Sequence, residues 1–387
     1  MKKRVLALIL AAATVVSLSG CTTLFKKDYL SVTKYQDDIK NSSSRDIGQI
    51  SDYAELKNAI ISMVNNHQTE GRLRFTDYDG TILGDISQAL WEVKAESALA
   101  SFAVDYMSYD LSRIVTYYEA VVYITYKHTQ SEISDIHYIT GRSELADIIQ
   151  TLLEEMDSYV ALRITSSTIT GEEITAAVSK AYEQNPASCV VPPIVTVTIH
   201  PESGLQRIIE IELEYGWKLT ELQKMKSALN EKVQKIVENA ANIKPAALAL
   251  DLYEKLAQNC AYDPTGSMRS SRTELNSGLG ATAYGALVEG YADSKGFAAA
   301  YSALCRAVGI DCQVVEGTQS GETHYWDIIK LGDFYYHIDA SAYYAAGIAH
   351  SFMQSDEQMR ENYEWDAEKY PVCSDQKTYS DIIKRIF

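Results

Sequence analysis

The stretch from residue 282 to residue 340 constrains the possible folds of this chain most. Its middle part predicts a helix, because apolar side chains recur three and four residues apart. These side chains are Phe297, Tyr301, Leu304 and Val308. Gly309 follows directly and predicts the end of the helix, since glycine readily adopts the left-handed conformation found after helix termini.

Three segments with strand-like alternation follow this helix, at 312–317, 324–331 and 334–340. The last two are separated only by Gly332 and Asp333, and a two-residue Gly-Asp connection predicts a tight hairpin. A helix followed by an antiparallel sheet indicates an α+β fold for this part of the chain. Such a hairpin would also bring His324 and Asp339 opposite each other on neighbouring strands.

The preceding half of the chain, residues 49–242, is predicted to form a mixed α/β domain. Helical spacing predicts helices at 52–66, 85–107, 143–157, 171–184 and 217–241. Alternation and β-branched or aromatic residues predict strands at 115–127, 159–168, 194–200 and 207–215. A further amphipathic helix at 246–257 opens the C-terminal domain, which we predict to cover 243–387. No chemical constellation stands out in the N-terminal half, and its role stays open.

The C-terminal motifs resemble the transglutaminase-like domain, a branch of the papain-type cysteine hydrolase fold. The matching segments occur in the family's order: TAYGALVEG, the helix ending LCRAVGID, the strand opened by HYW and the strand ending YYHIDAS. The resemblance implies a nucleophile at the start of the helix, a histidine that opens the next motif strand and an aspartate that ends the following one. Carried over position by position, these are Ser294, His324 and Asp339.

Ser294 departs from the family, which has a cysteine at this position. A thiol is readily ionised beside an imidazolium and a helix N-terminus, whereas a hydroxyl attacks only if a base removes its proton during the step. Three interpretations are open: a helix N-cap, a site that binds without reacting, and a working Ser-His-Asp triad. We favour a non-catalytic module that binds an extended peptide, from protein or cell wall. The alternative is an amide hydrolase or acyltransferase that uses Ser294 as nucleophile.

The neighbours of these residues are candidate ligand contacts. The candidates for lining the cleft are Trp326, Tyr325 and Gly296, and for Trp326 we favour packing beneath the cleft over lining it. Cys260, Cys305 and Cys312 fall away from the helix start and are interpreted as packed small apolar residues. The sequence indicates no cofactor and no metal site.

The N-terminus predicts export and lipid attachment. Three cationic residues precede an apolar run that is shorter than the roughly 20 residues of a spanning helix, as in a secretory signal. The following Leu18-Ser19-Gly20-Cys21 resembles the lipobox of bacterial lipoproteins, which implies cleavage after residue 20 and lipid on Cys21. A polar tether over 21–48 would then hold the protein at the outer face of the cell membrane. The formal charge of −17 argues against nucleic-acid binding.

Overall fold

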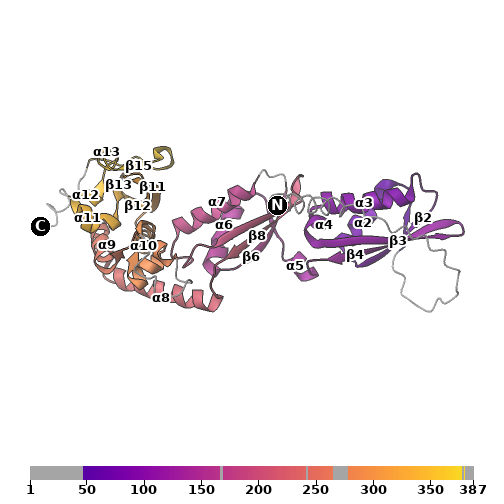
Figure 1. Ribbon diagram of the computed structural model, residues 1–387, viewed down its shortest axis with the longest axis horizontal. Coiled ribbons are helices and arrows are strands. Elements are labelled where there is room, and N and C mark those ends of the chain that lie inside the picture. Colours follow the sequence, from indigo (N-terminus) through magenta and orange to yellow (C-terminus); the bar gives the residue numbers. More distant parts are fainter. Residues whose placement is uncertain (1–46, 166–168, 241–242, 265–277, 377–378, 380–387) are drawn as a thin grey trace, which may run out of the picture. The chain divides into compact units, whose positions relative to one another are not determined.

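The computed structural model describes residues 47–165, 169–240, 243–264, 278–376 and 379 (Figure 1). The predicted signal peptide and almost all of the predicted tether lie outside these ranges. Within them, no helix combines the length and apolar character that a membrane span requires.

Two compact units make up the chain. One contains the described parts of residues 1–135 together with 200–208, and the other contains 136–199 together with 209–387. The domain boundary that we predict after residue 242 falls inside the second unit, and it remains a prediction.

The first unit packs helices against a sheet with the strand order β1-β2-β4-β3. The strands are β1 (Ile47–Ile50), β2 (Glu70–Phe75), β3 (Val104–Ile114) and β4 (Tyr117–Tyr126). The helices are α2 (Tyr53–Asn65), α3 (Ile82–Glu96), α4 (Ala98–Ala103) and α5 (Gln130–Ser134). Figure 1 shows α2 and α3 lying along one face of this sheet.

The helix predicted over 85–107 is wrong in its second part. Ser97 ends α3 and caps α4, where its hydroxyl accepts a hydrogen bond from the Ala100 amide. From Val104 onward the chain is β3, which pairs along its length with β4. The apolar residue at 104 fits a helical stripe and a strand equally well, so periodicity alone did not separate the two.

The middle of the chain forms a second sheet, with the strand order β5-β6-β8-β7. Its strands are β5 (His137–Ile139), β6 (Tyr159–Thr165), β7 (Ile194–His200) and β8 (Gln206–Glu214). The helices α6 (Arg142–Glu155) and α7 (Gly171–Gln184) bury their apolar faces against it. The long helix α8 (Leu219–Val237) then buries Leu222 in this core and Leu229 in the next one, so it belongs to both.

The C-terminal part consists of two main helices, a curved antiparallel sheet and short connecting elements. Before the sheet lie α9 (Pro245–Asn259), β9 (Ala261–Tyr262), η4 (Leu279–Ala281), η5 (Gly285–Glu289), β10 (Tyr291–Ala292) and α10 (Ser294–Ala307). The sheet contains β11 (Cys312–Gln319), β12 (Glu322–Leu331), β13 (Phe334–Ile338), β14 (Phe352–Gln354) and β15 (Tyr363–Trp365). Between and after these strands lie η6 (Ala340–Ala342), α11 (Tyr343–Ala346), α12 (Ile348–Ser351), α13 (Asp356–Met359) and η7 (Ala367–Lys369).

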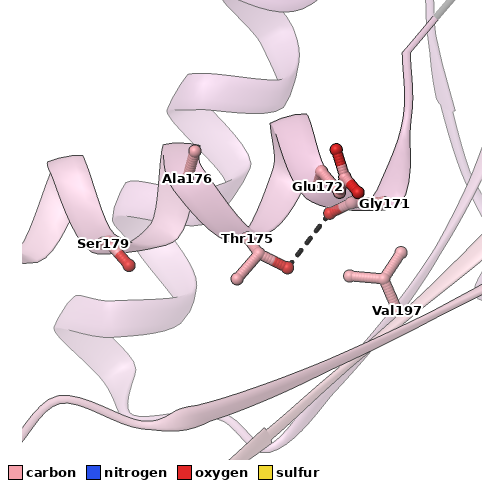
Figure 2. Close-up of a pocket in the computed structure, with 6 residues that line it drawn as sticks. All are labelled: Gly171, Glu172, Thr175, Ala176, Ser179 and Val197. Carbon is pink, nitrogen blue, oxygen red and sulfur yellow. Dashed lines mark hydrogen bonds between the residues drawn. The ribbon is translucent and has the colours of Figure 1, made fainter.

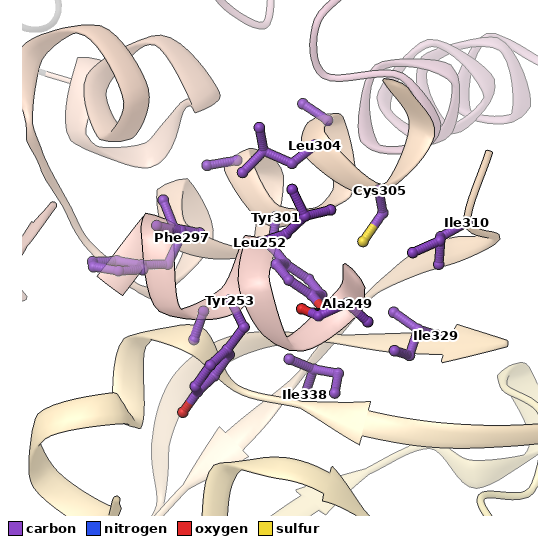
Figure 3. Packing of buried hydrophobic residues seen from close by; sticks show 14 of the residues in the cluster. Ala249, Leu252, Tyr253, Phe297, Tyr301, Leu304, Cys305, Ile310, Ile329 and Ile338 are labelled. Atoms are coloured by element: carbon purple, nitrogen blue, oxygen red, sulfur yellow. Dashed lines mark hydrogen bonds between the residues drawn. The ribbon is translucent and has the colours of Figure 1, made fainter. Parts of the chain in front are cut away.

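This arrangement confirms the predicted α+β class. The strand order is β14-β13-β12-β11-β15, and every neighbouring pair is antiparallel. The predicted hairpin is present, with Leu331 opposite Phe334 and Gly332 at a φ of 66°. Figure 3 shows α9 and α10 packed on the sheet through Leu252, Tyr301 and Ile338.

Candidate active site

Ser294 is the first residue of α10, and the residue before it caps the helix. Asp293 has extended backbone geometry, and its carboxylate accepts a hydrogen bond from the Gly296 amide. The interpretation of Ser294 as the N-cap is therefore wrong, because the capping position lies one residue earlier. The Ser294 side chain is thereby left for other contacts, and the residue is only 7% exposed.

The Ser294 hydroxyl contacts the strand that carries His324. Its Oγ accepts a hydrogen bond from the Tyr325 backbone N–H at 3.3 Å. The strand β13 pairs with β12 only between Asp327 and Leu331, so the Tyr325 amide lies beyond that ladder. No hydrogen bond joins Ser294 to the His324 ring within the described residues.

His324 and Asp339 form the pair that the sequence predicts. The His324 Nε2 lies 2.8 Å from Asp339 Oδ2, and the two residues are 5% and 1% exposed. Because an ionised carboxylate can only accept, Nε2 carries the proton of this bond. The other ring nitrogen, Nδ1, is then the one that could take a proton from a reacting group.

The Asp339 carboxylate is held by several further donors. Tyr363 donates to Oδ2 at 2.8 Å, the Ser341 hydroxyl donates to Oδ1 at 2.6 Å, and the amides of Ser341 and Ala342 also reach Oδ1. Burial would raise the pKa of Asp339, but hydrogen bonds from His324, Ser341 and Tyr363 outweigh burial and lower the pKa. The carboxylate therefore stays ionised and keeps the imidazole in one orientation.

Sequence reasoning missed Ser341 and Tyr363. Ser341 had a local signal, because an aspartate followed by a serine two residues later is typical of a side-chain-to-backbone turn. Tyr363 had none, since it lies 24 residues after Asp339 on a three-residue strand. Its ring also meets the His324 ring edge-on, with 5.7 Å between the ring centres.

Two of the three expected ligand contacts are packed in the interior. Trp326 is 1% exposed and donates from Nε1 to His337 Nδ1, so a direct ligand contact does not fit its position. Gly296 is buried as well, and a side chain there would collide with the carbonyl oxygen of Gly280. Tyr325 is half-buried, with the Lys295 ammonium 4.9 Å from its ring centre.

A buried group near the site, made of His337, Asp356 and Cys373, has the residue types of a metal site. Its potential ligand atoms lie within 4.8 Å of one another. However, the Trp326 N–H can only donate, so His337 Nδ1 must accept and the ring proton sits on Nε2, 3.0 Å from Asp356. A protonated Nε2 cannot bind a metal, and burial lowers the pKa of His337, which keeps this neutral form. The hydrogen bonds therefore do not fit a metal ion here.

The second unit has a surface hollow away from this site, between α7 and β7 (Figure 2). Its lining residues are Gly171, Glu172, Thr175, Ala176, Ser179 and Val197. The Thr175 hydroxyl is engaged by the Gly171 carbonyl oxygen of its own helix. The lining contains no pairing of a nucleophile with a base.

Comparison with known proteins agrees with the motifs in the C-terminal domain. Residues 230–347 match the model of the transglutaminase-like superfamily, and this range contains Ser294, His324 and Asp339. No match was found among curated proteins.

Solved structures of related description overlap weakly. A crystal structure of a TGase is 9% identical, covering 65% of this chain and 68% of that one with a TM-score of 0.27. A proposed cysteine protease from Cytophaga hutchinsonii is 12% identical, covering 47% of this chain and 70% of that one with a TM-score of 0.25. At these values the likeness carries no argument about the activity of this chain.

Proposed function

We propose that this chain is a bacterial lipoprotein whose transglutaminase-like domain binds an extended peptide without turning it over. Cys21 would carry the lipid and hold the domain at the outer face of the cell membrane. The observation that supports a non-catalytic role is the serine at position 294, where the family has its nucleophilic cysteine.

The contacts of Ser294 favour this role over catalysis. Its hydroxyl accepts from the Tyr325 amide, and within the described residues it donates to no side chain. A hydroxyl cannot be stored as an alkoxide near neutral pH, so attack needs a base that removes its proton during the step. The observed partner is a donor, which cannot take a proton.

The surroundings of Ser294 suit a peptide ligand. Lys295 and Tyr325 are half-exposed beside it, and the carboxylate of Glu316 on β11 approaches the Tyr325 hydroxyl. On its β13 side, β12 is unpaired before Asp327 in the described chain. An extended peptide could use such backbone groups, while the charged side chains would contact its side chains.

Calorimetric titration of the full chain with a synthetic cell-wall stem peptide tests the proposal, with an unrelated linear peptide of protein origin as a second probe. Saturable binding of either peptide should survive Ser294→Ala and weaken at least tenfold in Lys295→Ala. Mass spectrometry of the same mixtures should show intact peptide. Turnover that Ser294→Ala abolishes would rule out a purely binding role, and the absence of binding by both peptides would rule out the peptide site.

The second candidate is an amide hydrolase or acyltransferase with Ser294 as nucleophile. One observation favours it: the Asp339 carboxylate is ionised and hydrogen-bonded to His324, as a working triad requires. A fluorophosphonate probe should then label Ser294 in the folded protein, and His324→Ala should abolish the label. Folded protein that stays unlabelled would exclude this candidate.

A further inference from the structure

Asp327 lies in the interior between α10 and the sheet, on the opposite face of β12 from His324. It is 0% exposed, and burial raises the pKa of its carboxyl well above the ordinary value. Its Oδ1 accepts a hydrogen bond from the Cys312 thiol at 3.4 Å. Its Oδ2 has no hydrogen-bond partner among the residues that the structure describes.

A second thiol adjoins this pair. Cys305 belongs to the last turn of α10 and is completely buried. Figure 3 shows its sulfur directed toward the strand that carries Ile329, and Ile329 pairs directly with Cys312. Because directly paired residues share a face of the sheet, the Cys312 side chain lies on the same face as Ile329 and so faces Cys305, and the nearby Cys305 thiol adds to burial in raising the pKa of the Cys312 thiol.

We propose that Cys305 and Cys312 form a reversible disulfide that joins the end of α10 to the start of β11. Each thiol loses its hydrogen, and one S–S bond forms between them. The two electrons and two protons pass to a disulfide oxidant, whose own S–S bond is reduced to two thiols. Export to an oxidising compartment, part of the proposed function, would supply such an oxidant, although the chemistry itself does not depend on export.

The two cysteines differ in access, which fixes the order of the steps. Cys312 is half-buried whereas Cys305 is completely buried, so Cys312 is the less shielded of the two residues. The oxidant would therefore form a mixed disulfide with Cys312 first. Cys305, which is shielded from solvent, would then displace the oxidant's thiol from Cys312.

Asp327 makes this disulfide easy to reduce. Oxidation removes the Cys312 S–H group that donates to Asp327 Oδ1. The buried carboxyl, whose Oδ2 has no hydrogen-bond partner among the described residues, then loses this donor. The reduced state keeps that hydrogen bond. Because α10 begins at Ser294, the disulfide would also fix the position of the helix that presents the candidate nucleophile to β12.

Peptide mapping after oxidation tests the proposal on the folded full chain. After incubation with glutathione disulfide, we expect a Cys305–Cys312 cross-linked peptide in the wild type and equally in Cys260→Ser, a control that removes another buried cysteine. Cys305→Ser should instead trap glutathione on Cys312, at least tenfold above any other cysteine. The cross-link should raise the urea denaturation midpoint of the wild type, and a reductant should reverse the shift.

Wild-type protein that keeps both thiols free in excess glutathione disulfide would overturn the proposal, and this measurement needs no variant to fold. A cross-link between other cysteines would overturn it as well. Neither result bears on peptide binding or on fluorophosphonate labelling, so failure of this proposal is distinguishable from failure of the proposed function.

Discussion

Replacing Ser294 by cysteine places a thiol at the start of α10 and measures whether the His324–Asp339 pair can activate it. The new thiol would lie at the start of α10, and the strand that residue 294 contacts also carries His324, which is hydrogen-bonded to the ionised Asp339 carboxylate. If the imidazole contacts position 294, an imidazolium and the α10 N-terminus should both stabilise a thiolate there.

The size of the effect follows from thiolate fractions at pH 7. A thiol with the ordinary pKa of about 8.5 is roughly 3% ionised, and one lowered to about 6.5 is roughly 75% ionised, a gain of about 25-fold. Burial raises the pKa of Cys260 to about 12 and likewise that of Cys189 to about 12. Thiols of that kind are ionised to roughly 1 part in 10⁵ at pH 7, so the thiolate fraction of the introduced thiol should exceed theirs by nearly 10⁵-fold, about 7 × 10⁴.

The assay is a short iodoacetamide pulse on folded protein, with each labelled cysteine quantified by peptide mass spectrometry. The informative comparison is Ser294→Cys alone against Ser294→Cys combined with His324→Ala. Position 294 is only 7% exposed, and this limited access slows both proteins alike, so their ratio reports the imidazole. We expect the ratio to be about 10 to 25 at pH 7 and to decline toward 1 near pH 9.

Equal rates in the two proteins would refute the reasoning. They would mean that the His324 ring does not act on position 294. A working triad would then be excluded, and so would a cleft that keeps the family's geometry.

Three further predictions concern the support of the site. Tyr363→Phe removes a donor from the buried Asp339 carboxylate and should lower the free energy of unfolding by about 1.5–3 kcal/mol in urea titrations. The control is Tyr336→Phe, which should be nearly neutral because the Tyr336 hydroxyl has no partner among the described residues. Burial raises the pKa of Asp327, so the folded state holds a proton that the unfolded chain releases above about pH 4, and stability falls as the pH rises from there. Asp327→Asn should remove this loss, so that between pH 5 and pH 7 its free energy of unfolding rises relative to that of the wild type by up to about 1.4 kcal/mol per pH unit. A difference in unfolding free energy that does not change with pH would contradict this prediction. Gly296→Ala should cost about 1–3 kcal/mol or more by thermal or urea unfolding, because the new methyl group meets a backbone oxygen, and an unchanged midpoint would show that this contact can relax.

The sequence predicted best those features that depend on neighbouring residues. The apolar stripe of α10, the Gly332-Asp333 turn and the order of the motifs were sufficient to pair His324 with Asp339. Each of these signals is local, since helix periodicity and turn chemistry act over a few residues.

The features that the sequence did not predict depend on residues far apart in the chain. The start of β3, residues 104–107, was predicted as helix because the stability of this strand comes from pairing with β4, which no local pattern records. Trp326 was ambiguous because an alternating strand identifies the face of a side chain but not what covers that face. The hydrogen bond from Tyr363 to Asp339 had no signal in the sequence, since it joins two short segments through a chain reversal.

The contact between Ser294 and Tyr325 explains how a buried hydroxyl is stable at position 294. The Tyr325 amide lies past the end of the β12–β13 ladder and close to the buried site, where an unsatisfied N–H would cost about 1–3 kcal/mol. A hydroxyl oxygen accepts such a hydrogen bond well, whereas a thiol sulfur is a weak acceptor and sits on a longer bond to Cβ. A serine at this position therefore satisfies the backbone amide, whereas a cysteine would be the more easily ionised nucleophile.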